Sequence, residues 1–223
     1  MLRPRGALDR HMQELQDEVL ALGSMVDKAI DRAVNALKRR DTDEARHVIE
    51  DDLKTNRKRL EIEEKALELI ATQQPMAGDL RFVATVLSAV TDLERMGDHA
   101  EGIAKIVLML GDEPPIKKLI DIPRMADKAR DMLRRTLEAL VARDAEAAKQ
   151  IADEDDELDA LQDQIYRELL TIMLSKPETI QRATYLLWVA HNLERIGDRV
   201  TNICERIVFL VTGKMEEMNV STY

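Results

Sequence analysis

The stretch LERMGDH at residues 93–99 decides the fold, because the chain repeats it as LERIGDR at residues 193–199, one hundred residues later. Each copy carries two acids spaced i and i+4, which a helix places on one face, about 5–6 Å apart at Cβ. Each copy also carries a glycine, which costs roughly 1 kcal/mol against alanine inside a helix. Since helix energetics oppose this sequence twice, its repetition indicates a requirement other than helix stability.

Apolar side chains around the two copies recur at helical spacing. From Leu8 to Leu37 they alternate in steps of three and four, which is typical of the buried face of a helix. A second helix is expected to end before Pro75, because proline cannot continue a helix from within. The remaining expected helices begin near residues 77–79 and run to 110, cover 125–140, cover 151–172 and run from about 179 to 211.

The whole three-helix unit is duplicated. The break at Arg143-Asp144 repeats the break at Arg40-Asp41, and Pro177 repeats Pro75. We therefore expect an all-α fold, a tandem repeat of two antiparallel three-helix bundles with six long helices. The expected boundaries are a first bundle at 1–111, a linker at 112–120, a second bundle at 121–213 and a polar tail at 214–223. Coiled-coil rods are the alternative, and the regular breaks count against one long rod.

Composition restricts the classes of partner. The formal net charge of −10 argues against a general nucleic-acid or anionic-membrane binder, because phosphate contact needs a basic surface. The single cysteine, Cys204, excludes an intrachain disulfide and thiol-based metal sites, and it indicates a cytoplasmic protein. The apolar runs fall short of the ~20 residues that a membrane span needs, so we expect membrane association only through partners.

In several expected helices, acidic residues occupy the positions that continue the spacing of the apolar residues. The line through Leu87 and Val90 continues as Glu94 and Asp98, and Asp155 stands in the line of the fifth helix. On adjacent antiparallel helices these side chains meet. The oxygen-bearing side chains on these lines are Asp52, Asn56, Glu94, Asp98 and Glu101 in the first half, and Asp155, Asp159, Glu194, Asp198, Asn202 and Glu205 in the second half.

Two interpretations of these acids stay open. Crowded carboxylates have raised pKa values or destabilise the fold, and a hard cation resolves this conflict because it prefers oxygen ligands. Alternatively, the acids form surface ion pairs with Arg95, Arg195 and nearby lysines, each worth about 0–1 kcal/mol. Gly97 and Gly197 fit either a close helix approach or room for an ion. His191 could join a site, but an ordinary helix-face histidine is the simpler interpretation.

Enzyme motifs are not found in the sequence. A carboxylate-bridged di-iron bundle needs Glu-x-x-His twice, and only Glu44 to His47 fits. The sequence contains no phosphate-cradling glycine loop, nucleophile elbow or zinc-hydrolase motif. We therefore expect that the protein is not an enzyme.

The repeated motif, its continuation Asn202-Ile203-Cys204-Glu205, the element Asp155-x-x-Leu158-Asp159 and the run at residues 185–188 together resemble the PhoU family of bacterial phosphate-uptake regulators. The resemblance covers essentially the whole chain. It implies two three-helix bundles in a cytoplasmic regulator that binds the ATPase subunit of a phosphate ABC transporter and a phosphate-sensing histidine kinase. Exposed apolar lines on long helices also make a homodimer an expectation.

The resemblance further implies multinuclear metal clusters, of iron, zinc, manganese or magnesium, at the acid pairs. Asp155, Asp159, Glu194, Asp198 and Asn202 would form the second-half site, and Asp52, Glu94 and Asp98 the first-half site. The first half departs from the pattern, since it has Asn56 in place of an acid, Gly102 in place of asparagine and Lys105 in place of Glu205. We therefore hypothesise tighter binding in the second half. The alternative functions are an iron-storing or iron-oxidising bundle and a helical scaffold without a ligand.

Overall fold

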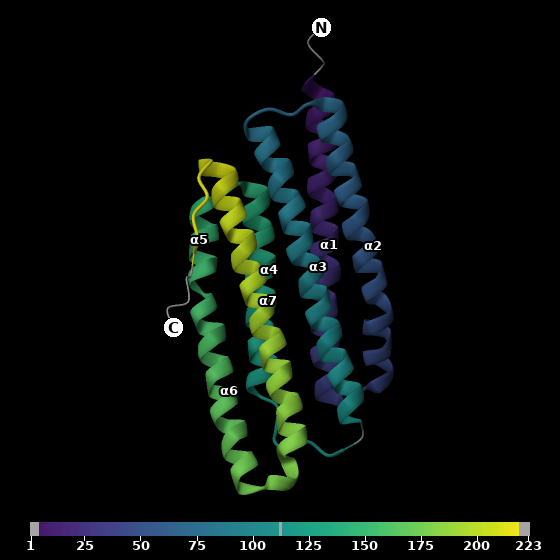
Figure 1. Cartoon of the computed structure of the whole chain (residues 1–223), viewed down its shortest axis with the longest axis vertical. Helices are drawn as coiled ribbons and strands as arrows, with labels where there is room; N and C mark the ends of the chain where they lie inside the picture. Colours follow the sequence, from purple (N-terminus) through teal and green to yellow (C-terminus); the bar gives the residue numbers. More distant parts are fainter. Residues whose placement is uncertain (1–4, 112, 219–223) are drawn as a thin grey trace.

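A computed structural model describes residues 5–111 and 113–218 of the chain (Figure 1). Over these residues the chain is helical and contains no strand. The helices are α1 (Arg5–Arg39), α2 (Thr42–Gln73), α3 (Gly78–Leu110), α4 (Asp121–Ala142), α5 (Ala145–Asp153), α6 (Asp155–Ser175) and α7 (Ile180–Thr212), with a 3-10 turn, η1 (Pro177–Thr179), before α7. No helix of the described chain is long and apolar enough to cross a membrane.

The connection between the first two helices is built the same way in each half of the chain. Arg40 and Arg143 adopt left-handed backbone conformations, with φ of 57° and 52°, and end α1 and α4. The next residue caps the following helix: Asp41 accepts a hydrogen bond from the Glu44 N–H at 2.9 Å, and Asp144 accepts one from the Ala147 N–H at 3.0 Å. Each cap satisfies a backbone donor that the helix itself leaves unpaired. The predicted duplication is therefore confirmed at the level of the turns.

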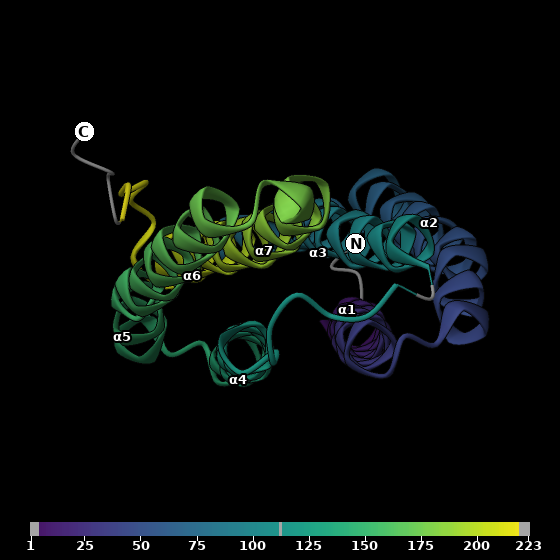
Figure 2. The same cartoon turned by 90° about the horizontal axis from the view of Figure 1, so that it is seen from below.

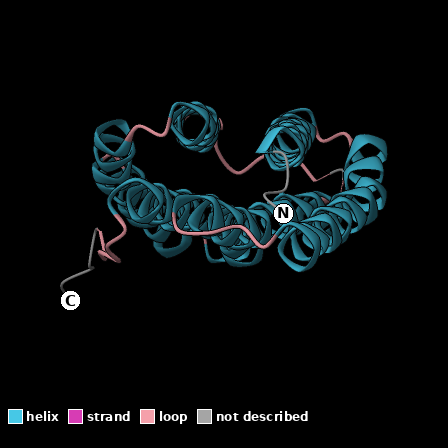
Figure 3. Ribbon diagram, turned by 90° about the horizontal axis from the view of Figure 1, so that it is seen from above, coloured by secondary structure: helices cyan, strands magenta, loops and turns pink. Residues whose placement is uncertain are grey.

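The helices form two layers. Seen along the helix axes, α2, α3, α7 and the α5–α6 segment lie in one curved row, and α1 and α4 cover one side of that row (Figures 2 and 3). In this row α3 and α7 are central neighbours, and α1 lies beside α4 in the second layer. The predicted all-α fold with a duplicated three-helix unit is confirmed, but the two units pack together along a broad face.

Polar side chains in the α3–α7 interface also follow the repeat. Arg199 Nη1 lies 3.5 Å from Asp92 Oδ1, and His99 Nδ1 lies 3.0 Å from Asn192 Oδ1. Positions 92 and 192 correspond in the two halves, as do positions 99 and 199. The two contacts are therefore equivalent pairs with different side chains, which marks an approximate two-fold relation between the halves.

The prediction of one continuous fifth helix is wrong, because the helix is interrupted at Glu154 between α5 and α6. Asp153 to Glu157 are five consecutive acids, which favour a helix N-terminus over a helix interior. Glu154 is also drawn toward α4, where Lys128 Nζ and Arg135 Nη2 each lie 2.8 Å from its carboxylate. A new helix thus begins at Asp155, the first of the acids assigned to the second-half site.

Candidate functional site

The second-half acids come from two helices in contact, α6 and α7. Asp155 and Asp159 belong to the first two turns of α6, and Glu194 and Asp198 lie on α7. Burial raises the pKa of Glu194 to about 7, and the charges of Asp198, Asp159 and Asp155 add to this effect. The pKa of Asp159 is raised as well, first by burial and then by Asp198. These four carboxylates therefore influence one another electrostatically across the contact of α6 with α7, and their assignment to a site stays a prediction.

Gly197 makes room for Asp155. A Cβ atom at position 197 would stand 2.5 Å from Asp155 Oδ1 and 2.6 Å from Leu158 Cδ1, both closer than van der Waals contact allows. Asp155 is only 5% exposed and Leu158 is fully buried, so a Cβ atom at position 197 would force the ends of both packed side chains to move. The glycine of the repeated motif is required here by close packing of α6 on α7.

The first-half acids form an equivalent group on α2 and α3. Burial raises the pKa of Asp52 to about 6, followed in effect by the charges of Glu101, Asp98 and Glu94. Glu101 was not assigned to the site from the sequence, although it continues the same helix line one turn after Asp98. A Cβ atom at Gly97 would lie 3.4 Å from Asp52 Oδ1 and 3.1 Å from Thr55 Cγ2, so the helices approach less closely than in the second half.

Basic side chains distinguish the two groups. In both halves the arginine of the motif pairs with the second acid, as Arg95 with Asp98 at 3.1 Å and Arg195 with Asp198 at 2.7 Å. Only the first half adds two further cations: Arg59 Nε lies 3.7 Å from Glu94, and Lys105 Nζ lies 2.6 Å from Glu101.

The second half carries Gln162 and Glu205 at the corresponding positions. Its carboxylates therefore have less compensating charge.

The remaining residues considered from the sequence, Asn202, Asn56 and His191, lie in different surroundings. Asn202 lines the same recess as Asp155 and Asp198, a hollow of about 260 Å³, but its amide donates to Asp92 Oδ1 at 3.3 Å. Asn56 donates a hydrogen bond to Asp52 at 2.8 Å. An acid at this position could not donate this bond in its ionised form. His191 Nδ1 lies 3.4 Å from Glu194 Oε2, at the edge of the group.

The donor set fits a hard cation in its chemistry. All the predicted donors are oxygen atoms, and Glu194 Oε2 is a buried atom that accepts no hydrogen bond from the described part of the chain. The side chains are not closed around one point: within residues 5–111 and 113–218, no three Asp, Glu, His or Cys side chains stand close enough to hold one ion as they are placed. A cation would therefore need side-chain rotation to collect its ligands.

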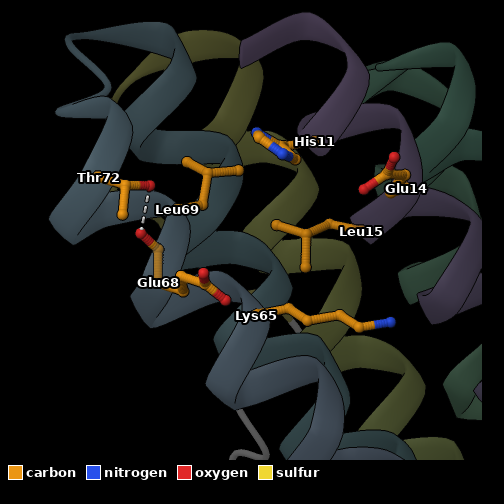
Figure 4. Close-up of a pocket in the computed structure, with 7 residues that line it drawn as sticks. All are labelled: His11, Glu14, Leu15, Lys65, Glu68, Leu69 and Thr72. Carbon is orange, nitrogen blue, oxygen red and sulfur yellow. Dashed lines mark hydrogen bonds between the residues drawn. The ribbon is translucent and has the colours of Figure 1, made fainter. Parts of the chain in front are cut away.

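A separate hollow lies between α1 and α2, near the start of α1 (Figure 4). It has a volume of about 230 Å³, and its lining combines His11 and Lys65 with Glu14 and Glu68. Thr72 Oγ1 donates to the Glu68 carbonyl at 2.7 Å, and Lys65 is paired with Glu18. None of the predicted site residues borders this hollow, and its balanced charges do not select a ligand.

The sequence and the fold both match known proteins. The PhoU domain family model matches residues 19–107 and 122–207. A phosphate-specific transport system accessory protein PhoU homolog from Clostridium acetobutylicum is 39% identical over 216 residues, which cover 96% of this chain and 99% of that protein. The homolog of the same description from Aquifex aeolicus is 35% identical over 208 residues, or 93% of this chain and 94% of that protein.

Solved structures give the same result. The crystal structure of the phosphate transport system regulatory protein PhoU from Streptococcus pneumoniae matches with a TM-score of 0.89 and 34% identity, covering 95% of this chain and 100% of that one. Both repeats of the helical unit fall within the matched regions, and together they include both carboxylate groups. The chain belongs to the PhoU family.

Proposed function

We propose that this protein is a cytoplasmic regulator of phosphate uptake and a negative regulator of phosphate-starvation signalling. It would act as an adaptor between the ATPase subunit of a phosphate ABC transporter and a sensor histidine kinase, by binding and not by catalysis. The observation that carries the proposal is the match over nearly the full length to relatives described as accessory and regulatory proteins of phosphate transport.

The two carboxylate groups are proposed as metal sites of this regulator. A bound iron, zinc, manganese or magnesium ion would supply positive charge where burial, and after it like charges, raise the pKa values of Asp52 and Glu194. Because each group joins two helices, α2 with α3 or α6 with α7, ligand binding there would stabilise the helix pair against separation. Arg59 and Lys105 partly replace such an ion in the first half, which supports weaker binding there.

A genetic complementation experiment tests the regulatory role. In a bacterium that lacks its own homolog, a phosphate-starvation phosphatase is measured at high phosphate, with and without this gene. Restored repression is expected. Unchanged phosphatase activity, with the protein present at normal level, would count against the proposal.

A thermal-shift series with Mg²⁺, Mn²⁺, Zn²⁺ and Fe²⁺ tests the metal role separately. Binding only to the folded state raises the melting temperature in proportion to the logarithm of ion concentration. Aerobic oxidation of many equivalents of Fe²⁺ per chain would instead favour an iron-handling bundle.

A further inference from the structure

The hairpin of α6 and α7 exposes a group of large apolar side chains at its closed end. Tyr166 and Trp188 are 52% and 49% exposed, and Leu170, Leu174 and Ile180 are exposed on the same two helices. The helices run antiparallel through η1, so residues 166–174 lie alongside residues 180–188 (Figure 1). We call these five side chains the hairpin patch.

Aromatic side chains are concentrated here. The chain has only six aromatic residues, and the Tyr185 ring packs against the Trp188 ring with centroids 5.6 Å apart, next to the hairpin patch. Tyrosine and tryptophan are the side chains most enriched in the energetically dominant part of protein interfaces. Half-exposed aromatics are therefore a stronger sign of a partner than exposed leucines alone.

Packing within the fold does not require these aromatics. When Asp52 is aligned with Asp155 and Glu94 with Glu194, Tyr166 corresponds to Glu63, Tyr185 to Thr85 and Trp188 to Ser88. The first half builds the same helix hairpin with polar residues at all three positions. The aromatic set is thus an addition made to one half only.

Acidic side chains continue from the hairpin patch along α6. Asp163 precedes Tyr166 by three residues and Leu170 by seven, so these three share one side of the helix. Asp156 stands a further seven residues back, which is about 10 Å along a helix. Both acids are exposed. The surface is apolar and aromatic at one end and acidic at the other, and the exposed Arg167 stands between them, four residues after Asp163.

We propose that the hairpin patch and this acidic row form a docking surface for a basic amphipathic helix of a partner protein. The partner helix would place apolar side chains at i, i+4 and i+7 on Tyr166, Leu170 and Trp188, and lysine or arginine one to three turns further along on Asp163 and Asp156. The inference rests on the proposed adaptor function, for which it supplies a binding surface.

Charge selects this occupant over two others. An anionic membrane surface would be repelled by Asp156 and Asp163, because juxtaposed like charges oppose binding. A second copy of this chain would bring an identical acidic row to the interface. A partner helix with apolar residues followed by basic residues is complementary to both the apolar end and the acidic end of the surface.

Trp188 makes the proposal measurable, because it is the only tryptophan of the chain. The probe is a synthetic helical peptide with leucines at i, i+4 and i+7 and lysines from i+11 onward on the same face, titrated into the full-length protein. We expect a blue shift of the Trp188 emission and binding that weakens with salt. The double variant Tyr166→Ala/Leu170→Ala should weaken binding about tenfold or more, since hot-spot side chains each contribute more than 1 kcal/mol.

Matched controls come from the first half. Leu67 and Leu80 are exposed leucines at the positions equivalent to Leu170 and Ile180, so Leu67→Ala/Leu80→Ala should leave binding within twofold. The charge variant Asp156→Asn/Asp163→Asn should lower affinity and flatten the salt dependence.

Four outcomes would overturn the proposal: no binding of the peptide, equal binding of a scrambled peptide, an equal loss in the control variant, or tighter binding to phosphatidylcholine vesicles than to the peptide. A concentration-dependent dimer that Trp188→Ala abolishes would assign the surface to a second copy. The titration needs no phosphate response, so complementation can succeed while peptide binding fails, and the two proposals fail separately.

Discussion

Replacing the two motif glycines by alanine should have different consequences, although the sequence motif is the same. At position 197 the new methyl group would meet Asp155 Oδ1 at 2.5 Å and Leu158 Cδ1 at 2.6 Å. At position 97 it would meet Thr55 Cγ2 at 3.1 Å, where a shift of a few tenths of an ångström restores contact distance. The pair is a controlled comparison, because both substitutions change glycine to alanine inside a long helix.

The magnitude follows from two opposing effects. Alanine stabilises a helix interior by about 1 kcal/mol relative to glycine. Overpacking of a buried contact costs about 1–3 kcal/mol. For Gly97→Ala the gain and a small cost nearly cancel, so stability should change by less than about 0.5 kcal/mol. For Gly197→Ala the contacts are shorter and the cost lies toward the upper end of its range, so we expect a net loss of up to about 2 kcal/mol.

Urea unfolding followed by circular dichroism measures both variants against the natural sequence. A difference of 1 kcal/mol corresponds to about 2–4 °C in melting temperature for a chain of this size, so a thermal scan gives a second reading. Equal stability of the two variants, or a Gly197→Ala protein more stable than Gly97→Ala, would refute the assignment of Gly197 to close packing against Asp155.

Three further predictions concern stability and reactivity. Burial raises the pKa of Cys204 to about 12, so iodoacetamide at pH 8 should label it only in unfolded protein, and rapid labelling of folded protein would contradict its burial. Asp144→Ala removes the cap that accepts from Glu146 and Ala147 N–H and should cost about 1 kcal/mol in urea unfolding; an unchanged midpoint would show that the cap contributes nothing. Hydrogen bonds from Lys58, then Lys65, hold the pKa of Glu18 below its ordinary value of 4.5. Its stabilisation, up to about 1 kcal/mol, is therefore present above that pH and lost as pH falls through the folded-state pKa. The stability difference between the natural protein and Glu18→Gln should shrink from pH 7 to pH 3, and a constant difference would contradict the pairing.

The helices were predictable because their signals are local. Alternating apolar steps from Leu8 to Leu37 and the prolines at 75 and 177 act within a few turns of chain. The layering of α1 and α4 over the row of the other helices was not predicted, since periodicity identifies a buried face without naming the helix that covers it. The run of acids at residues 153–157 is a local sign of the break at Glu154, but the contacts of Glu154 with Lys128 and Arg135 come from another helix and have no local signature.

The same distinction applies to the site. The meeting of Asp155 with Glu194 followed from antiparallel neighbours with acids in corresponding lines, and the fold places them so. The neutralising role of Arg59 on Glu94 was missed, because it depends on a long side chain reaching from α2 to α3. The metal assignment stays a prediction.

Metal content is the most direct test of the proposal that the carboxylate groups bind cations, the second more tightly. The natural protein, Asp155→Asn/Asp159→Asn and Glu94→Gln/Asp98→Asn are dialysed against limiting Mn²⁺, and bound metal per chain is measured by elemental analysis. Asn and Gln keep the side-chain shape while removing charge, so folded structure should persist in all three proteins. The greater metal loss is expected from the second-half variant; no bound metal in the natural protein, or a greater loss from the first-half variant, would contradict the proposal.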